Sequence, residues 1–189
     1  LEFRRVLFRS GNLISTEHMF DLAIEGEGFY QIRMPNGEIG YSRDGSFKID
    51  RDGSLVTANG YFVEPPITVP EDALRFNVTE DGAVTVNIPG QVDPQEIGQI
   101  TLVRFVNPAG LNRIGNNLYV ETAASGAPIE GQPLLDGFGS VRQNFLEQSN
   151  VKIVEEMVSL IVAQRAYEVN SKAIQTSDDM LGVANNLKR

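Results

Sequence analysis

The residues best suited to chemistry in this sequence are carboxylates placed at turns. Asp50-Arg51-Asp52-Gly53 spells the first part of a calcium-binding loop, in which oxygen ligands alternate and a glycine permits a sharp bend. A complete loop carries a Glu at its twelfth position, and the twelfth residue counted from Asp50 is Tyr61. The segment therefore predicts a hairpin turn, and we assign no metal site to it.

Other catalytic or metal-binding sets are equally hard to assemble. His18 is the only histidine and cysteine is absent, so a zinc site would need almost only carboxylates, which zinc rarely accepts. A carboxylate pair that cleaves glycans stays open as an alternative, with Asp44, Asp50 and Asp52 as its nearest candidates. Turn chemistry already explains these three residues. We therefore assign no catalytic, cofactor-binding or metal-binding residue.

Gly26-Glu27-Gly28 is a second short motif of the kind that can approach a ligand closely. It is too short for a phosphate cradle, and Glu25 and Glu27 would repel an anion. The motif instead predicts a tight bend or bulge before Phe29.

The charge balance narrows the choice of partners. The 189 residues contain 16 Lys and Arg against 25 Asp and Glu, a net charge of -9. Nucleic-acid affinity depends largely on clustered basic side chains, so we expect no nucleic-acid partner. The longest apolar cluster, residues 151–162, is interrupted by Lys152, Glu155 and Glu156, so we also expect no membrane insertion.

The first ten residues, LEFRRVLFRS, differ from the rest of the chain. Three Arg and one Glu give them a charge of +2, whereas the remainder sums to -11. They lack the apolar run and the small-residue cleavage site of a signal peptide. We interpret residues 1–10 as a non-native leader.

The region from about residue 20 to residue 120 has the pattern of an antiparallel β domain. Short apolar runs alternate with Asx-Gly pairs, which favour tight turns between strands. These pairs are Asn36-Gly37, Asp44-Gly45, Asp52-Gly53, Asn59-Gly60 and Asp81-Gly82. The predicted strands cover residues 22–24, 29–33, 39–43, 47–49, 55–57, 62–63, 76–78, 84–88, 98–105 and 118–121. Such short strands favour a sheet that closes on itself or packs face to face with another.

One long helix is predicted after residue 150. Residues 123–139 are rich in Gly, Pro and Ser and are typical of a connection. From Ser149 there is no Gly or Pro until Gly182, and Ser149 or Asn150 could cap a helix over residues 151–187. Its length would be about 55 Å. Its first half is apolar on several sides, so other chains or another part of this protein must cover it.

Two long stretches resemble the bacterial flagellar rod and hook family. DLAIEGEGFYQI (residues 21–32) and YSRDGSFKIDRDGSLVTANGYFVEPPITVP (residues 41–70) are similar to its central region. LEQSNVKIVEEMVSLIVAQRAYEVNSKAIQTSDDML (residues 146–181) is similar to its C-terminal helix motif. The stretch between them, IGQITLVRFVNPAGLNRIGNNLYVETAASGAP (residues 97–128), resembles most the members that build the distal rod.

The resemblance implies a structural subunit of the distal rod, exported by the flagellar secretion system and located in the basal body. Its implied partners are other copies of itself in a helical tube, the proximal rod and hook proteins, and the surrounding ring proteins. Family members begin with a long helix that pairs with the C-terminal one, and that helix is not in this sequence. We divide the chain into a leader (1–10), the remnant of a connecting segment (11–20), a β domain (21–122), a connection back to the tube (123–148) and a helical polymerisation domain (149–189).

The candidate site residues are contact residues of the helix. They are Val154, Met157, Val158, Ile161, Gln164, Tyr167, Asn170, Ser171, Ile174 and Leu181. Within this set we expect Gln164, Asn170 and Ser171 to fix the register between neighbouring helices, because buried polar groups select pairings. A solvated polar face is the alternative. Two alternative functions stay open: a proximal rod or hook protein, and a secreted glycan-binding or glycan-cleaving β domain.

Overall fold

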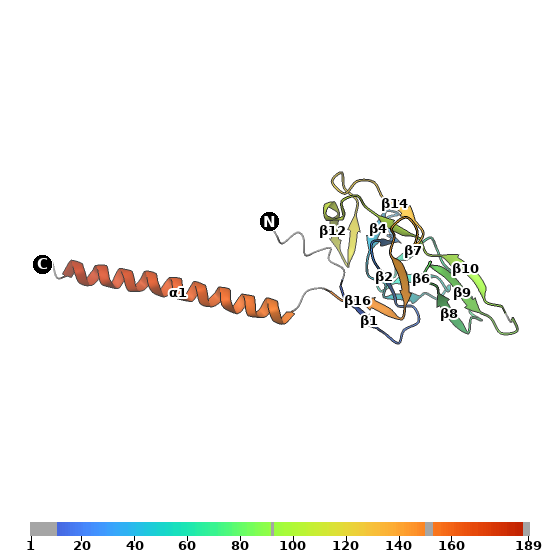
Figure 1. Cartoon of the computed structure of the whole chain (residues 1–189), viewed down its shortest axis with the longest axis horizontal. Helices are drawn as coiled ribbons and strands as arrows, with labels where there is room; N and C mark the ends of the chain where they lie inside the picture. Colours follow the sequence, from blue (N-terminus) through green and yellow to red (C-terminus); the bar gives the residue numbers. More distant parts are fainter. Residues whose placement is uncertain (1–10, 92, 150–152, 187–189) are drawn as a thin grey trace. The chain divides into compact units, whose positions relative to one another are not determined.

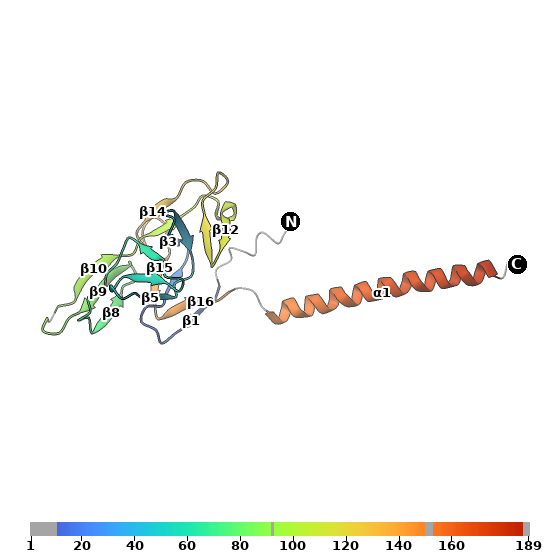
Figure 2. The same cartoon turned by 180° about the vertical axis from the view of Figure 1, so that it is seen from behind.

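The computed structural model describes residues 11–91, 93–149 and 153–186 (Figures 1 and 2). It divides into two units, residues 1–150 and residues 151–189, which we describe separately. The described part of the first unit, residues 11–149, is called the β domain below. The second unit is one helix. The predicted fold class, mainly antiparallel β structure with a single C-terminal helix, is confirmed.

The β domain contains sixteen strands among its described residues. They are β1 (Leu13–Ser15), β2 (Leu22–Glu25), β3 (Phe29–Arg33), β4 (Ile39–Ser42), β5 (Phe47–Ile49), β6 (Leu55–Thr57), β7 (Phe62–Glu64), β8 (Arg75–Val78), β9 (Ala83–Asn87), β10 (Gln95–Gln99), β11 (Leu102–Arg104), β12 (Asn112–Gly115), β13 (Leu118–Val120), β14 (Ile129–Gly131), β15 (Ser140–Gln143) and β16 (Phe145–Glu147). A short 3-10 turn, Pro108–Gly110, precedes β12.

A nine-stranded sheet forms the body of the domain. Its main path runs β12-β13-β4-β3-β7-β6-β5, and β11 joins it beside β3 with β14 on its outer side. Four of the Asx-Gly pairs make the predicted hairpins, with their glycines at φ between 77° and 83°. Glycine adopts this left-handed conformation without the steric cost that other residues incur. Strands β8, β9 and β10 form a separate sheet, which lies at the opposite end of the domain from β12 (Figures 1 and 2).

Three local predictions differ from the structure. Asp44-Gly45 is not a hairpin turn, because β4 and β5 do not pair; the segment crosses to another part of the sheet. The strand predicted over residues 98–105 is two strands, β10 and β11, broken after Gln99, where Ile100 turns to bond the carbonyl of Gly82. The segment 123–148, predicted as a connection, contains β14, β15 and β16, whose partners are distant in sequence.

The core is built around β3, which is buried on both faces. Tyr30 and Ile32 point into the larger of two apolar clusters, together with Leu22 of β2 and Leu102 of β11. Phe29, on the other face, belongs to a smaller cluster formed mainly by aromatic and aliphatic side chains of β4, β11 and the following loop. Because alternate residues of a strand face opposite sides, a strand that is apolar at both must be covered on both.

Two small two-stranded sheets pair strands near the beginning of the domain with strands near its end. Strand β15 pairs with β2, and β16, after a break at Asn144, pairs with β1. The two-stranded β1–β16 sheet is called the terminal ribbon below. Asn144 has φ 63°, a left-handed conformation that Asn tolerates better than most residues. The chain therefore turns at Asn144 and changes strand partner there.

The helix α1 spans Ile153–Asn186. The prediction placed it over residues 151–187, so the two observed ends agree with it to within the described residues. The residues directly before Ile153 lie outside the described ranges. The cap predicted at Ser149 or Asn150 therefore stays a prediction. No helix among the described residues is both long enough and apolar enough to cross a bilayer.

Candidate assembly site

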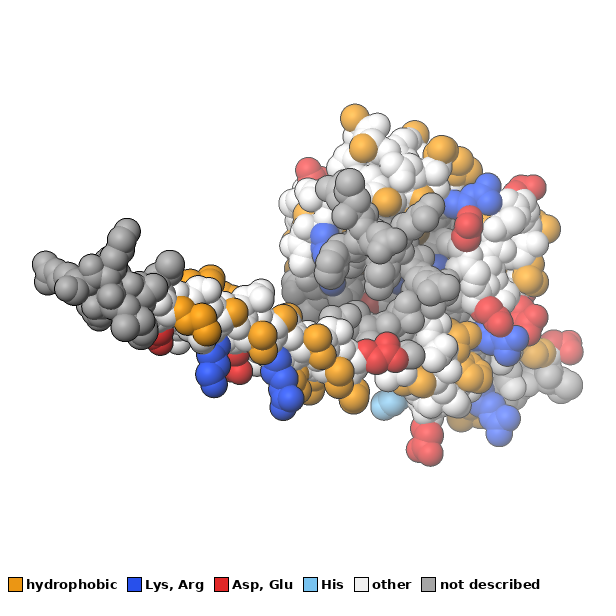
Figure 3. Space-filling model, turned by 60° about the vertical axis from the view of Figure 1, so that its left-hand side comes forward, with side chains coloured by type: hydrophobic (Ala, Val, Ile, Leu, Met, Phe, Trp, Pro, Cys, Tyr) orange, Lys and Arg blue, Asp and Glu red, His pale blue; other side chains and the backbone are white. Residues whose placement is uncertain are grey.

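Helix α1 exposes large apolar side chains along its described length (Figure 3). Their exposed fractions run from 49% at Ile161 to 77% at Tyr167. The other members of the set are Val154, Met157, Val158, Leu160, Val162, Val169, Ile174 and Met180. An exposed apolar surface of this extent marks an interaction site or an aggregation liability. The arrangement of side chains on α1 therefore suits binding to an apolar partner surface.

A seven-residue spacing links four of these side chains, Met157, Leu160, Tyr167 and Ile174, with three further positions of α1. Positions 157, 164 and 171 hold Met, Gln and Ser, and positions 160, 167, 174 and 181 hold Leu, Tyr, Ile and Leu. On a straight helix such a stripe drifts by about 20° per heptad, so it stays against a partner helix only when both supercoil to the left. We call these seven positions the heptad seam. Leu160 belongs to it, although the sequence analysis left it out of the candidate residues.

The remaining predicted residues lie beside the seam or on it. Val154, Val158 and Ile161 follow one another at four- and three-residue steps on an adjacent face, which makes the first half of α1 apolar on more than one side. Gln164 and Ser171 lie on the seam, and Asn170 lies about one turn from both Tyr167 and Ile174. Leu181 lies in α1, but its side chain is outside the part that the structure describes.

The terminal ribbon brings the two ends of the β domain side by side. Leu13 lies opposite Glu147, and Ser15 lies opposite Phe145. The amide of Gln148 donates to the carbonyl oxygen of Asn12 at 2.9 Å, which extends the pairing by one step. Residues 12 and 148, at the two ends of this pairing, therefore lie side by side.

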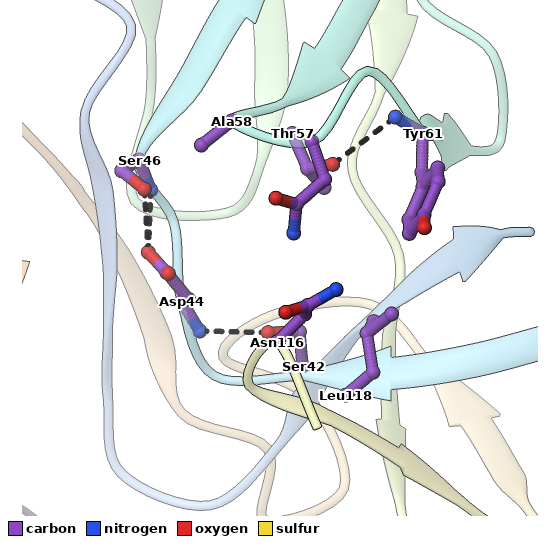
Figure 4. A pocket seen from close by; sticks show the side chains of 9 residues that line it. Ser42, Asp44, Ser46, Thr57, Ala58, Tyr61, Asn116 and Leu118 are labelled. Carbon is purple, nitrogen blue, oxygen red and sulfur yellow. Dashed lines mark hydrogen bonds between the residues drawn. The ribbon is translucent and has the colours of Figure 1, made fainter. Parts of the chain in front are cut away.

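The segment between β4 and β5 is fixed by a polar cluster around Asp44 (Figure 4). One carboxylate oxygen of Asp44 accepts from the amide of Ser46 at 3.0 Å and from its hydroxyl at 2.7 Å, and the other accepts from the side-chain amide of Asn117 at 2.9 Å. Burial raises the pKa of Asp44, but these hydrogen bonds from Ser46 and Asn117 outweigh it, so the pKa lies below its ordinary value. Asp44 thus ties this segment to the β12–β13 hairpin.

The same segment passes very close to β2. A Cβ atom added to Gly45 would lie 1.6 Å from the carbonyl oxygen of Leu22, so only glycine fits. The Leu22 amide in turn donates to the Gly45 carbonyl oxygen at 3.0 Å. The Asp-Gly pair that suggested a hairpin is therefore required by a close backbone approach.

Arg43, next in sequence to Asp44, is a partly buried charge that sequence reasoning missed. Its Nε atom lies 2.8 Å from Oε2 of Glu147, and the two side chains are only 22% and 15% exposed. The pair lies near Tyr30, whose hydroxyl donates to the Leu22 carbonyl oxygen at 2.9 Å. Burial raises the pKa of Tyr30; Arg43 lowers this pKa by a smaller amount, and Glu147 raises it slightly. The signal in the sequence was an Arg placed directly after a buried strand.

Of the carboxylates considered for catalysis or calcium, Asp50 and Asp52 lie at the β5–β6 turn, whereas Asp44 lies in the segment that crosses from β4 to β5. Asp50 closes the β5–β6 turn, where the Gly53 amide donates to its carbonyl oxygen at 3.0 Å. The hollow beside Asp44 has a volume of about 20 Å³, room for about one water molecule and far below that of a ligand pocket. Within the described ranges, no three His, Asp or Glu side chains gather closely enough to hold a metal ion.

Comparison with known proteins gives matches on both units. The family described as flagellar hook protein FlgE/F/G D1 domain matches residues 23–86, and the family described as flagellar basal body rod FlgEFG protein C-terminal matches residues 142–187.

The names of similar proteins agree with these families. The flagellar basal-body rod protein FlgG of Borreliella burgdorferi is 56% identical over 185 residues, 97% of this chain and 70% of the relative. FlgG of Buchnera aphidicola subsp. Schizaphis graminum is 49% identical over 175 residues, 93% of this chain and 67% of the relative. The flagellar hook protein FlgE of Escherichia coli is 36% identical over 132 residues, 70% of this chain and 31% of the relative. The chain therefore belongs to the flagellar rod and hook family FlgE/F/G, within its group of basal-body rod proteins FlgG.

Proposed function

We propose that the chain is a structural subunit of the flagellar distal rod and polymerises into a tubular shaft that carries torque from the motor to the hook. The observation that carries this proposal is the apolar surface of α1, where side chains such as Met157, Leu160 and Ile174 are at least 60% exposed. Leaving a stripe of this kind in water is unfavourable by roughly 25 cal/mol for each Å² of apolar surface. Covering it with neighbouring helices supplies the free energy of assembly.

The seam and its neighbouring face account for more than one helical neighbour. The heptad seam fits one helix in a left-handed pair. Val154, Val158 and Ile161, on the adjacent face, need further cover in the first half of α1. In a tube, each subunit meets several others through unlike surfaces, and a heterologous contact that does not close gives a helical filament.

The terminal ribbon supplies the geometry for a second helix from the same subunit. Because Gly11 and Asn12 lie beside Gln148, a helix placed before the ribbon in a longer chain would end close to the point where the chain leaves the ribbon toward α1. The family resemblance implies such a helix. We therefore infer that the apolar surface of α1 is shared between a helix of its own subunit and helices of other copies.

The further partners and the location follow from the same role. A rod subunit contacts the proximal rod below, the hook above and the ring proteins around it, and it reaches that position through the flagellar secretion system. We infer a structural role and no catalysis. Of the carboxylates considered for the glycan-cleaving alternative, Asp44 has both its carboxylate oxygens engaged by Ser46 and Asn117.

Placing a charge on the seam tests the proposal in the complete gene. Ile174→Glu puts a carboxylate on the seam, whereas Thr176→Glu adds the same charge about 160° away around the helix. We expect Ile174→Glu to abolish rods in purified basal bodies and to stop swimming, and Thr176→Glu to leave both in place. Normal rods with Ile174→Glu would contradict the proposal.

Polar residues on and beside the seam give a finer test. We expect Gln164→Leu and Asn170→Leu to reduce rod assembly and motility while the β domain keeps its stability, because a buried polar group selects the register of its neighbours. Glu168→Gln, a change of similar size on the same helix, serves as the control. Normal swimming of both leucine variants would refute the register role.

A further inference from the structure

The guanidinium of Arg43 donates to four acceptors from two segments of the chain: the carboxylate of Glu147 and three carbonyl oxygens within residues 24–28. Besides Glu147, its Nη1 atom donates to the carbonyl oxygens of Gly26 and Gly28 at 2.8 and 2.9 Å, and its Nη2 atom donates to the carbonyl oxygen of Ile24 at 3.1 Å. Only the planar fork of arginine offers donors in these directions, since a lysine has one compact ammonium group. The arrangement is thus specific to arginine.

The carbonyl acceptors are placed by the Gly26-Glu27-Gly28 bend. Gly26 has φ 120°, and a Cβ atom there would lie 2.8 Å from the Cα atom of Gly139. With this backbone conformation, the carbonyl groups of Gly26 and Gly28 both point toward Arg43 and accept hydrogen bonds from its Nη1 atom. The motif that resembled an anion loop in the sequence is therefore a cradle for an internal cation.

Glu147 joins Arg43 to both strands of the terminal ribbon. Its Oε2 atom accepts from Arg43, and its Oε1 atom accepts from the amide of Gly11 at 2.7 Å. Glu147 itself lies in β16, and Gly11 precedes β1. One carboxylate thus holds the incoming segment, the outgoing segment and the end of β4.

This junction lies three residues after Asn144, where the strand pairing of the chain changes. At Asn144 the chain leaves β2 and changes to β1 as its partner; the Asn144 amide donates to the carbonyl oxygen of Asp21 at 2.8 Å, and its own carbonyl oxygen accepts from the Thr16 amide at 2.7 Å. A change of partner with left-handed φ is a natural hinge, because the ladder of hydrogen bonds is interrupted there. After this turn, the Arg43–Glu147 pair joins β16 of the ribbon to the end of β4 in the nine-stranded sheet.

We propose that Arg43 and Glu147 are positioning residues that anchor the terminal ribbon to the rest of the β domain. Mechanical load that arrives along the ribbon then reaches the nine-stranded sheet through this ion pair. The load-bearing part rests on the proposed function, whereas the anchor itself is a property of the single chain. The pair is suited to the task because its charges are largely withdrawn from water and every bond to Arg43 is charge-assisted. The Arg142–Glu25 pair, with side chains 43% and 52% exposed, has no comparable shielding.

Hydrogen exchange of the full chain tests the anchor directly. We expect Arg43→Lys to speed amide exchange in the ribbon and at its ends, for example at Thr16 and Gln148, by about tenfold or more. Exchange in the β8–β9 hairpin is expected to stay within about twofold of the wild-type rate. Arg142→Lys is the matched control, with ribbon exchange unchanged. Equal acceleration in the ribbon and in β8–β9 would make Arg43 a residue of the whole fold and would overturn the proposal, as would an unchanged ribbon.

A second variant keeps the test decisive if Arg43→Lys does not fold. Glu147→Gln removes the charge from the other partner, and we expect the same ribbon-specific acceleration. In the double variant the two effects are expected to be clearly less than additive, because both remove one interaction. Full additivity, or no effect of Glu147→Gln on the ribbon, would contradict the anchor.

Rod assembly separates this proposal from the proposed function. In the complete gene we expect Arg43→Lys to form rods and to swim normally in dilute medium but more slowly than the wild type at high viscosity, while Arg142→Lys swims like the wild type. Normal swimming of Arg43→Lys at every viscosity would overturn the load-bearing part. A wild-type chain that forms no rods, with the exchange pattern as expected, would contradict the proposed function and support the anchor.

Discussion

The β domain and α1 use apolar residues in opposite ways. In the β domain, Leu22, Ile32 and Leu102 are fully buried between strands that are far apart in sequence. In α1, Leu160 and Ile174 are 60% and 64% exposed. One unit completes its own core, whereas the other exposes large apolar side chains, which we propose are covered by partner helices.

This difference separates folding from assembly within one chain. Long-range strand pairing and the buried clusters give the β domain a cooperative fold of its own. Most helical stability in proteins comes from packing of the apolar face, and an unpacked helix is marginal in water. We therefore expect variants in one unit to act on stability and variants in the other to act on polymerisation.

The largest expected contrast is in hydrogen exchange of the dilute full chain. We expect amides in the described part of α1 to exchange at least about 100-fold faster than those of Ile32 and Val63, since the apolar side chains of α1 are exposed and an unpacked helix is marginal in water. Exchange measured by mass spectrometry at several concentrations checks this. If α1 self-associates, its protection rises with concentration; concentration-independent protection equal to that of β3 would break the comparison.

A pair of leucine truncations gives the next largest effect. Leu102→Ala removes a fully buried side chain, and we expect it to lower the free energy of unfolding by about 3 kcal/mol. Leu160→Ala, the matched change in α1, is expected to alter the unfolding of the β domain by less than about 0.5 kcal/mol. Urea denaturation followed by far-UV circular dichroism and tyrosine fluorescence measures both. Equal losses would show that α1 shares the core.

Local patterns predicted much of the β domain because much of it is made of hairpins. Four Asx-Gly pairs lie between strands that pair with each other, so turn chemistry and alternation are enough to locate them. The pairings of β15 with β2 and of β16 with β1 left no such mark. Their partners lie more than a hundred residues away, and the segment before them is rich in Gly and Pro.

The candidate site divides in the same manner. The apolar stripe of α1 follows from spacing alone, which is why residues such as Met157 and Ile174 could be chosen from the sequence. Arg43 could not, because its role depends on Glu147, 104 positions away, and on backbone carbonyls that acquire their direction only in the fold. A periodic face is a local property, whereas an anchor between distant segments is a tertiary one.

A smaller, pH-dependent effect is expected at Asp44. Asp44→Asn loses the bond from Asn117, and we expect a cost of about 1 kcal/mol near neutral pH. The hydrogen bonds hold the pKa of the folded carboxyl below its unfolded value of about 3.9, so its contribution is present above that value and is lost as the pH falls through the folded pKa. Urea unfolding between pH 6 and pH 2 is therefore expected to show the two proteins converging below about pH 4. A difference that grows toward low pH would reverse the assignment.

The smallest effect is expected where charge is exposed on the β domain. Arg142 Nε lies 2.6 Å from Glu25 Oε2, yet both side chains are largely in water, and such pairs contribute little because solvent screens them and ordering two long side chains has an entropic cost. We expect Arg142→Gln to change the free energy of unfolding by less than about 0.5 kcal/mol, and the change to shrink further as salt is added. Urea denaturation at low and high salt measures it. A loss above about 1 kcal/mol that resists salt would mean that the β domain depends on its surface as well as on its core, and the division between a self-sufficient core and an assembly surface would have to be drawn less sharply.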